Sequence, residues 1–145
     1  MAINFFQEDI QYSLPQKNLT KRWLREIAKK EGFKIRDLNY IFCTDEYLYQ
    51  INVDYLNHDT YTDIITFDNS EEEAILEGDI FVSIERIFDN AKTQKQDIYK
   101  ETIRVISHGL LHLCGYKDKT KEEASLMRSK EDEGIKHFFE LKENA

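Results

Sequence analysis

Two histidines spaced four residues apart are the side chains of this chain best suited to bind a metal ion. On a helix, His108 and His112 would lie one turn apart and present both imidazoles to one point. Gly115 can end that helix in a left-handed turn, so that the chain reverses and Asp118 returns toward the histidines. Two histidines and a carboxylate form catalytic zinc sites, which keep a fourth position for water. The sequence therefore predicts one zinc ion per chain, although iron, manganese or nickel could use similar ligands.

The residue after the first histidine argues against the most familiar use of this spacing. The order of the ligands is typical of metzincin-type zinc sites, whose proteases carry a glutamate directly after the first histidine as general base. In this chain the position is occupied by Gly109. A protease therefore stays an alternative, but one without its expected base.

The elements that position these residues predict an α+β fold, with a small mixed sheet covered mainly by helices. Apolar and β-branched runs predict strands at 3–7, 38–44, 64–67 and 78–84. Apolar residues at helical spacing predict helices at 20–31, 45–55, 85–93, 97–113 and 120–139. The second of these helices is expected to carry its apolar side at Tyr47, Leu48, Ile51 and Tyr55. Thr20, Asp45 and Thr120 are expected to cap three of these helices, the last through a capping box with Glu123. The helix that carries the histidines is apolar enough to cross the middle of the domain.

Composition predicts one domain over residues 1–145. Hydrophobic residues make up 41% and charged residues 33%, as in ordinary globular proteins, and no apolar run is long enough to cross a membrane. The N-terminus lacks the basic and long apolar regions of a secretory signal, so we expect a cytoplasmic protein. Cys43 and Cys114 are expected to be small core residues rather than a disulfide framework.

The charges are unevenly distributed along the chain. The formal net charge of −8 argues against a protein that coats nucleic acid indiscriminately, yet residues 17–36 contain eight Lys or Arg and only two Glu. A basic helix on an acidic body can be a landing surface for RNA, or simply a solvated face. The candidate RNA-binding residues are Lys21, Arg22, Arg25 and Lys29.

Three stretches resemble one known family. Residues 108–116, His-Gly-Leu-Leu-His-Leu-Cys-Gly-Tyr, are similar to the signature H-G-x-L-H-L-x-G-Y-D-H of the YbeY family of bacterial endoribonucleases. Residues 59–67 resemble the family's D-x-P-T-D-V-L-S-F, and residues 78–83 its G-D-I-x-I-S. The resemblance implies a cytoplasmic, zinc-dependent nuclease for single-stranded RNA, acting in ribosome quality control and in ribosomal RNA maturation, including the 3′ end of the small-subunit RNA. The implied partners are ribosomal RNA and the small ribosomal subunit, with neither DNA nor a membrane expected.

The chain departs from the family pattern in its ligands and in its positive charges. Asp118 stands where the family commonly has its third metal-binding histidine, which makes the site more negative by one unit and should weaken the Lewis acidity of the metal. Tyr61 replaces a proline, and Leu56 aligns with the family's arginine near the active site, which could stabilise a phosphate. Arg104, Lys117 and Lys119 are the candidates for the missing charge, although ordinary surface salt bridges explain each of them equally well.

The resemblance makes metal-assisted phosphodiester hydrolysis the leading hypothesis, with some roles open. Asp59 and Asp63 are candidates for the general base, or residues that cap a turn. Gly109 either leaves room beside the metal for a bulky sugar-phosphate or allows close helix packing. The alternatives are a metal-dependent protease or other small hydrolase, and a ribosome-assembly factor with a structural metal and weak or lost catalysis.

Overall fold

The computed structural model describes residues 2–57 and 62–144, which form four strands and five helices. The strands are β1 (Ala2–Glu8), β2 (Lys34–Cys43), β3 (Ile64–Asp68) and β4 (Ile75–Ser83). The helices are α1 (Lys17–Lys30), α2 (Asp45–Leu56), α3 (Ile84–Thr93), α4 (Ile98–Leu113) and α5 (Lys121–Glu143). Each expected strand and helix is present, with ends that shift by up to four residues.

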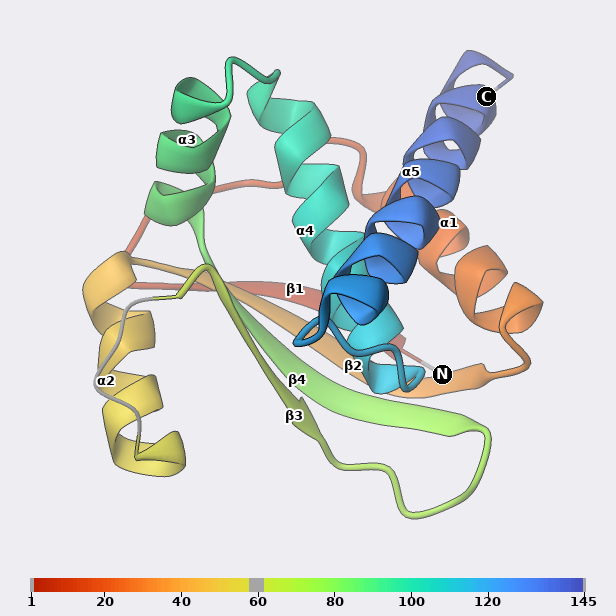
Figure 1. Cartoon of the computed structure of the whole chain (residues 1–145), viewed down its shortest axis with the longest axis horizontal. Helices are drawn as coiled ribbons and strands as arrows, with labels where there is room; N and C mark the ends of the chain where they lie inside the picture. The colour runs from red at the N-terminus through yellow and green to blue at the C-terminus, as the bar shows by residue number, and fades with distance from the viewer. Residues whose placement is uncertain (1, 58–61, 145) are drawn as a thin grey trace.

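The sheet is mixed, as expected. Its strands lie in the order β1-β2-β4-β3, where β1, β2 and β4 are parallel and β3 runs antiparallel to β4. Helices α1, α3, α4 and α5 lie on one face of the sheet and α2 lies on the other (Figure 1). The α+β class is thereby confirmed. None of the helices in the described part of the chain is both long and apolar enough to cross a membrane.

Helix α4 runs through the main core, because most of its side chains are buried between the sheet and the other helices. Gly109 lies on the side of α4 that faces the sheet. A Cβ atom added there would lie 2.9 Å from Ile80 Cγ2 and 3.0 Å from Ile64 Cδ1, closer than side chains pack. Close packing of the helix against β3 and β4 therefore explains this glycine. The idea that it leaves room beside the metal for a substrate is wrong, because position 109 faces the sheet.

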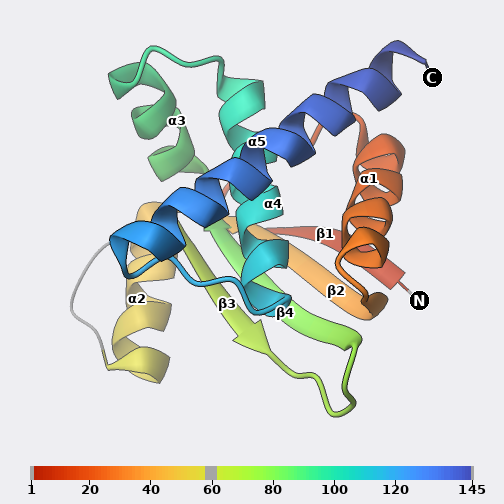
Figure 2. The same cartoon turned by 45° about the vertical axis from the view of Figure 1, so that its right-hand side comes forward.

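Helices α1 and α5 lie against each other on the same side of the sheet (Figure 2). Trp23 of α1 is fully buried, packs edge-on against Phe138, and donates a hydrogen bond from Nε1 to the carbonyl oxygen of Gly134 at 2.8 Å. Gly32, with φ of +89°, follows the end of α1 as expected for a helix stop. The contacts of Trp23 with Phe138 and Gly134 hold the long helix α5 against α1.

Two of the three predicted caps are wrong. Helix α1 begins earlier, after Gln16, and Thr20 is a buried helical residue whose Oγ1 donates to the Gln16 carbonyl oxygen at 2.8 Å. A threonine hydroxyl satisfies its own helix in this way when it cannot reach water. Helix α2 is capped by Thr44, whose side chain accepts from the Tyr47 amide, so Asp45 is the first helical residue. The capping box of Thr120 is confirmed.

The remaining differences concern lengths and exposure. Strand β2 begins at Lys34, four residues before its expected start, because it pairs with β4 from Ile75 onward. Helix α5 continues four residues beyond Phe139, to Glu143. Tyr55, expected on the apolar side of α2, is 73% exposed, whereas Cys43 is buried as expected.

Candidate metal centre

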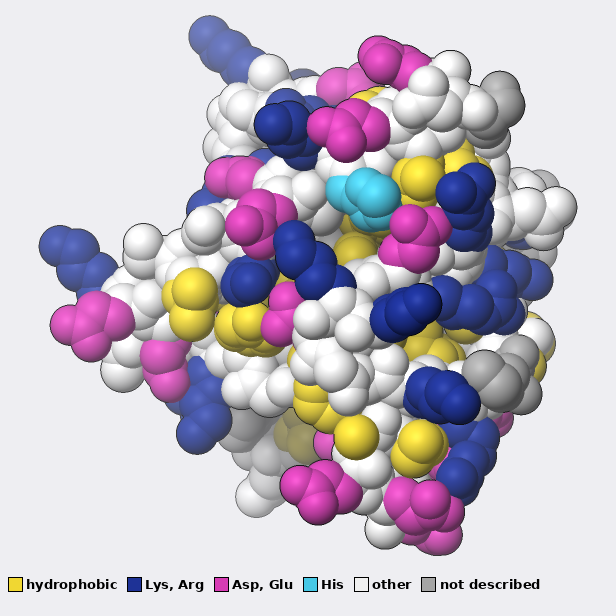
Figure 3. Space-filling model, turned by 90° about the vertical axis from the view of Figure 1, so that its right-hand side faces the viewer, with side chains coloured by type: hydrophobic (Ala, Val, Ile, Leu, Met, Phe, Trp, Pro, Cys, Tyr) yellow, Lys and Arg dark blue, Asp and Glu magenta, His cyan; other side chains and the backbone are white. Residues whose placement is uncertain are grey.

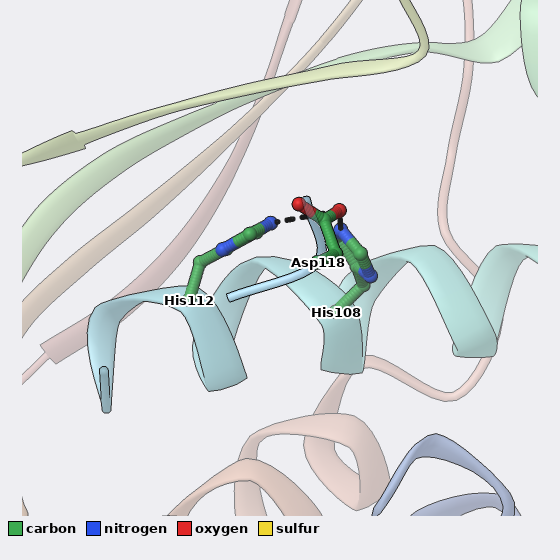
Figure 4. Close-up of side chains that lie close together, drawn as sticks. All are labelled: His108, His112 and Asp118. Carbon is green, nitrogen blue, oxygen red and sulfur yellow. Dashed lines mark ion pairs between the residues drawn. The ribbon is translucent and has the colours of Figure 1, made fainter. Parts of the chain in front are cut away.

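His108 and His112 lie on one face of α4 and point to the same place (Figure 4). The Nε2 atoms of His108 and His112 lie 3.2 Å and 3.4 Å from Oδ2 of Asp118. One potential ligand atom from each of the three residues lies within 4.8 Å of the other two. The structure therefore brings together all three residues that the sequence predicts as metal ligands.

The reversal that returns Asp118 to the helix is built by the expected glycine. Gly115 has φ of +105°, a left-handed conformation that side chains rarely adopt. Its amide donates to the carbonyl oxygen of His112 at 3.0 Å, and the next amide, of Tyr116, donates to that of Leu111 at 3.0 Å. This pair of bonds is a Schellman motif, which satisfies the last carbonyls of a helix while the chain turns back.

Each histidine has a partner on the ring nitrogen that faces away from Asp118. Nδ1 of His112 lies 3.0 Å from the carbonyl oxygen of Tyr116, and Nδ1 of His108 lies 2.6 Å from Oε2 of Glu131. A carbonyl or carboxylate oxygen only accepts, so both Nδ1 atoms carry hydrogen. In the neutral rings, the lone pairs are then left on Nε2, on the side of Asp118. Metal-binding histidines use their second nitrogen in this way, because the outer bond fixes the tautomer and the ring orientation.

Glu131 also belongs to the site, although it was not predicted from the sequence. Its side chain is only 6% exposed and lies between His108 and Arg104. Burial lowers the pKa of His108, but the hydrogen bond and charge of Glu131, together with the charges of Asp118 and Asp63, outweigh burial, so that this pKa is raised. A signal did exist in the sequence. Glu131 falls at helical spacing in the buried stripe of α5, where an acidic residue is unusual; the other members are Met127, Gly134, Ile135 and Phe138.

Arg104 lies one turn before His108 on α4 and is largely buried. One terminal nitrogen lies 3.1 Å from Glu131 Oε1 and the other lies 2.8 Å from Asp132 Oδ1. Its side chain is 12% exposed. Both terminal nitrogens thus bind carboxylates of α5.

Asp63 lies beside the candidate ligands. A cavity of about 400 Å³ is lined by Asp63, Arg104, His108, Asp118 and Glu131, among others. Asp63 stands just before β3 and is half-buried, and burial raises the pKa of its carboxyl. Asp59, the other candidate base, and the neighbouring Tyr61 and His58 lie outside the described residues.

The other predicted functional residues are not part of this cluster. Leu56 is the last residue of α2 and is 39% exposed. The four candidate RNA-binding residues lie on α1, where Arg22 pairs with Glu26 at 3.0 Å. Viewed from the side of α1, the surface shows Lys and Arg side chains interspersed with Asp and Glu (Figure 3). Lys117 and Lys119 flank Asp118 and are exposed.

The sheet, the two-histidine helix and the returning carboxylate define a small α+β protein with a candidate metal centre of two imidazoles and one carboxylate. A family model described as Endoribonuclease YbeY matches residues 2–139. The chain therefore belongs to the YbeY endoribonuclease family, which confirms the resemblance seen in the sequence and the enzyme class that it implies.

Relatives cover nearly the whole chain. The Endoribonuclease YbeY of Cytophaga hutchinsonii is 58% identical over 92% of this chain and 94% of its own length. That of Flavobacterium johnsoniae is 50% identical over 92% of this chain and 95% of its own length. The solution structure of TM1509 from Thermotoga maritima is 28% identical and superposes with a TM-score of 0.67, covering 99% of this chain and 93% of that one. The fold is thus shared with a solved structure.

Proposed function

We propose that this protein is a zinc-dependent endoribonuclease specific for single-stranded RNA, with His108, His112 and Asp118 as metal ligands. Membership of the YbeY family supports the reaction class. The observation that carries the proposal is the convergence of two imidazole Nε2 atoms and one carboxylate oxygen on a single point. We further propose that its substrate is ribosomal RNA, including the 3′ end of the small-subunit RNA, and that it acts in the cytoplasm in rRNA maturation and ribosome quality control.

The three residues fit zinc in their chemistry and in the distances of Asp118 from the two histidines. Zinc takes two histidines and a carboxylate in catalytic sites, with bonds of about 2.0–2.2 Å, and a tetrahedron of such bonds puts neighbouring donor atoms about 3.3 Å apart. The distances from Asp118 Oδ2 to the two Nε2 atoms, 3.2 Å and 3.4 Å, match that separation. When bound there, zinc supplies a water of lowered pKa and polarises a phosphate oxygen.

The residues around the ligands would accept the proton taken from water and balance the charge of the phosphate. Asp63 is our candidate for the general base, because its carboxyl lines the same cavity as His108 and has a raised pKa. A carboxylate with a raised pKa holds a proton taken from water more readily. Arg104 already binds two carboxylates, which favours the exposed Lys117 and Lys119 as partners of the phosphate.

The structure argues against the protease alternative and in favour of the assembly-factor alternative. A protease of the metzincin type needs a glutamate at position 109, and the packing of Gly109 against Ile80 leaves no room for one. The assembly-factor alternative is favoured by one observation, the engagement of Arg104 with Glu131 and Asp132, which keeps this buried arginine from binding a phosphate. The nuclease and the assembly factor would therefore differ in whether they cleave RNA, and not in whether they bind the metal.

Metal analysis followed by cleavage of a labelled single-stranded RNA tests the proposal. We expect the purified protein to hold one zinc per chain and to cleave the RNA, and the His112→Ala variant to lose both properties. His137→Ala is the matched control, because His137 lies on α5 and bonds only to Glu26 among the described residues. Stoichiometric zinc without cleavage, but with ribosome association, would support the assembly factor instead. Cleavage that survives His112→Ala would show that the site is elsewhere.

A further inference from the structure

Glu131 is a buried carboxylate held by two residues of α4. Oε2 lies 2.6 Å from His108 Nδ1 and Oε1 lies 3.1 Å from an Arg104 terminal nitrogen. A charge removed from water is destabilising unless it is paired and hydrogen-bonded. Each oxygen of Glu131 has such a partner, and both partners come from the same helix, one turn apart. The arrangement ties α5 to α4 directly beside the candidate ligands.

The two histidines are held by different kinds of acceptor. His112 uses the carbonyl oxygen of Tyr116, which belongs to the turn that follows its own helix, and so is fixed by local backbone geometry. His108 uses a side chain that is 23 residues further along the chain and belongs to another helix. A carboxylate partner carries a full negative charge and makes a shorter, stronger hydrogen bond than a neutral carbonyl. His108 therefore depends on the docking of α5, and His112 does not.

We propose that Glu131 is a positioning residue that holds His108 with hydrogen on Nδ1 and with Nε2 directed at the metal, while Arg104 balances its charge. The metal part of this inference rests on the proposed function. Without Glu131, the ring of His108 is free to carry its hydrogen on Nε2 and to donate it to Asp118, which would occupy the atom that binds the ion. Loss of such an outer partner typically lowers metal affinity about 10–100-fold.

The decisive variants are Glu131→Gln and the matched control Asp132→Asn. Both remove one carboxylate from α5, and both residues contact Arg104, but only Glu131 contacts His108. Zinc affinity is measured by competition with a chelating dye. We expect Glu131→Gln to weaken zinc binding about 10–100-fold and Asp132→Asn to change it by less than about threefold.

The second measurement is the tautomer of His108 in the metal-free protein, read from nitrogen-15 NMR of the imidazole at a pH where the ring is neutral. We expect hydrogen on Nδ1 in the wild type and in Asp132→Asn, and a mixture of tautomers in Glu131→Gln. A mere loss of fold stability would not change the ring in this selective way. The wild-type spectrum alone can overturn the proposal, so an unfolded Glu131→Gln variant does not remove the test.

The outcomes separate this proposal from the proposed function. Hydrogen on Nε2 in the wild type, or a zinc affinity that Glu131→Gln leaves unchanged, would overturn the role of Glu131 even in a protein that cleaves RNA. Conversely, a wild type that binds zinc without cleaving RNA would overturn the nuclease proposal. The tautomer and the zinc affinity would still report on Glu131.

Discussion

Helices α1 and α4 cover the same face of the sheet but present their polar residues in opposite ways. On α4, His108, His112 and Arg104 each bond to a partner outside the helix, and all three are largely shielded from water. On α1, Arg22 and Arg25 are exposed, and Arg22 pairs only within its own helix among the contacts described. A metal centre requires fixed distances, whereas attraction of a phosphate backbone requires only charge. Changes on α4 should therefore act through geometry, and changes on α1 through charge.

The largest expected effect is the loss of a ligand next to α4. Asp118→Ala removes the carboxylate that lies 3.2 Å and 3.4 Å from the two imidazoles, and we expect zinc affinity to fall by more than about 100-fold, beyond the effect of losing an outer partner. Asp118→His is the informative control, because it keeps a third ligand of the type common in the family and should retain one zinc. Chelator competition measures both. Unchanged zinc affinity in Asp118→Ala would mean that Asp118 is only a hydrogen-bond partner of the histidines.

The second prediction compares two glycines in helices that pack against different partners. Gly109→Ala places a Cβ 2.9 Å from Ile80 Cγ2, and overpacking of this kind destabilises by about 1–3 kcal/mol. Gly134→Ala, on α5 against α1, places its Cβ at 3.6 Å from Ile27 and from Trp23, an ordinary contact. Since alanine favours a helix over glycine by about 0.5–1 kcal/mol, this variant should be stabilised. Urea unfolding measures the stability of both variants. A change of the same sign in both would contradict the difference in packing between the two glycines.

The sequence was most informative where the relevant contacts are local. The spacing of His108 and His112, the stop at Gly115 and the return of Asp118 all depend on helix geometry over a few residues, and the structure has all of them. Glu131 could not be assigned in the same way, because its contact with His108 joins two helices across 23 residues. The exposure of Tyr55 could not be predicted for the same reason, since local periodicity does not say how far the neighbouring elements extend.

The two cap predictions were wrong for a related reason. Thr20 has the residue type of a cap, but the same hydroxyl can bond inside a helix, and the choice depends on burial against the core. The role of Gly109 was also undecidable from the sequence, because both explanations require a small residue. Only the positions of Ile80 and Ile64 distinguish them.

The third prediction concerns the positive charges of α1. Reversal of Lys21, Arg22 and Arg25 to Glu should weaken the binding of single-stranded RNA more at low salt than at high salt. The slope of log affinity against log salt should fall by about 0.7 for each phosphate that the protein no longer neutralises. Zinc content should not change. The control reverses three exposed lysines on α3, α4 and the segment between them, which changes the net charge equally: Lys92, Lys95 and Lys100. Equal weakening in both variants would mean that net charge alone, and not the face of α1, attracts the RNA.

The smallest expected effect is on the pH dependence of stability and comes from Asp63, beside the metal centre. Burial raises the pKa of its carboxyl above the ordinary value of 3.8, so the folded protein holds this proton more tightly than the unfolded chain. Asp63 therefore stabilises the fold least when it is ionised, and its contribution falls as pH rises from 3.8 through the folded pKa. In the metal-free protein, Asp63→Asn should accordingly gain stability relative to the wild type as pH rises through that window, and the gain should then level off. Urea unfolding at a series of pH values measures the difference, with Asp89→Asn, an exposed residue of α3, as the control for loss of one charge. A stability gain of Asp63→Asn that decreases with rising pH would mean that the fold stabilises Asp63 as a carboxylate. Asp63 would then resemble the charge-paired groups of α4, and the reason to assign it as the base would be lost.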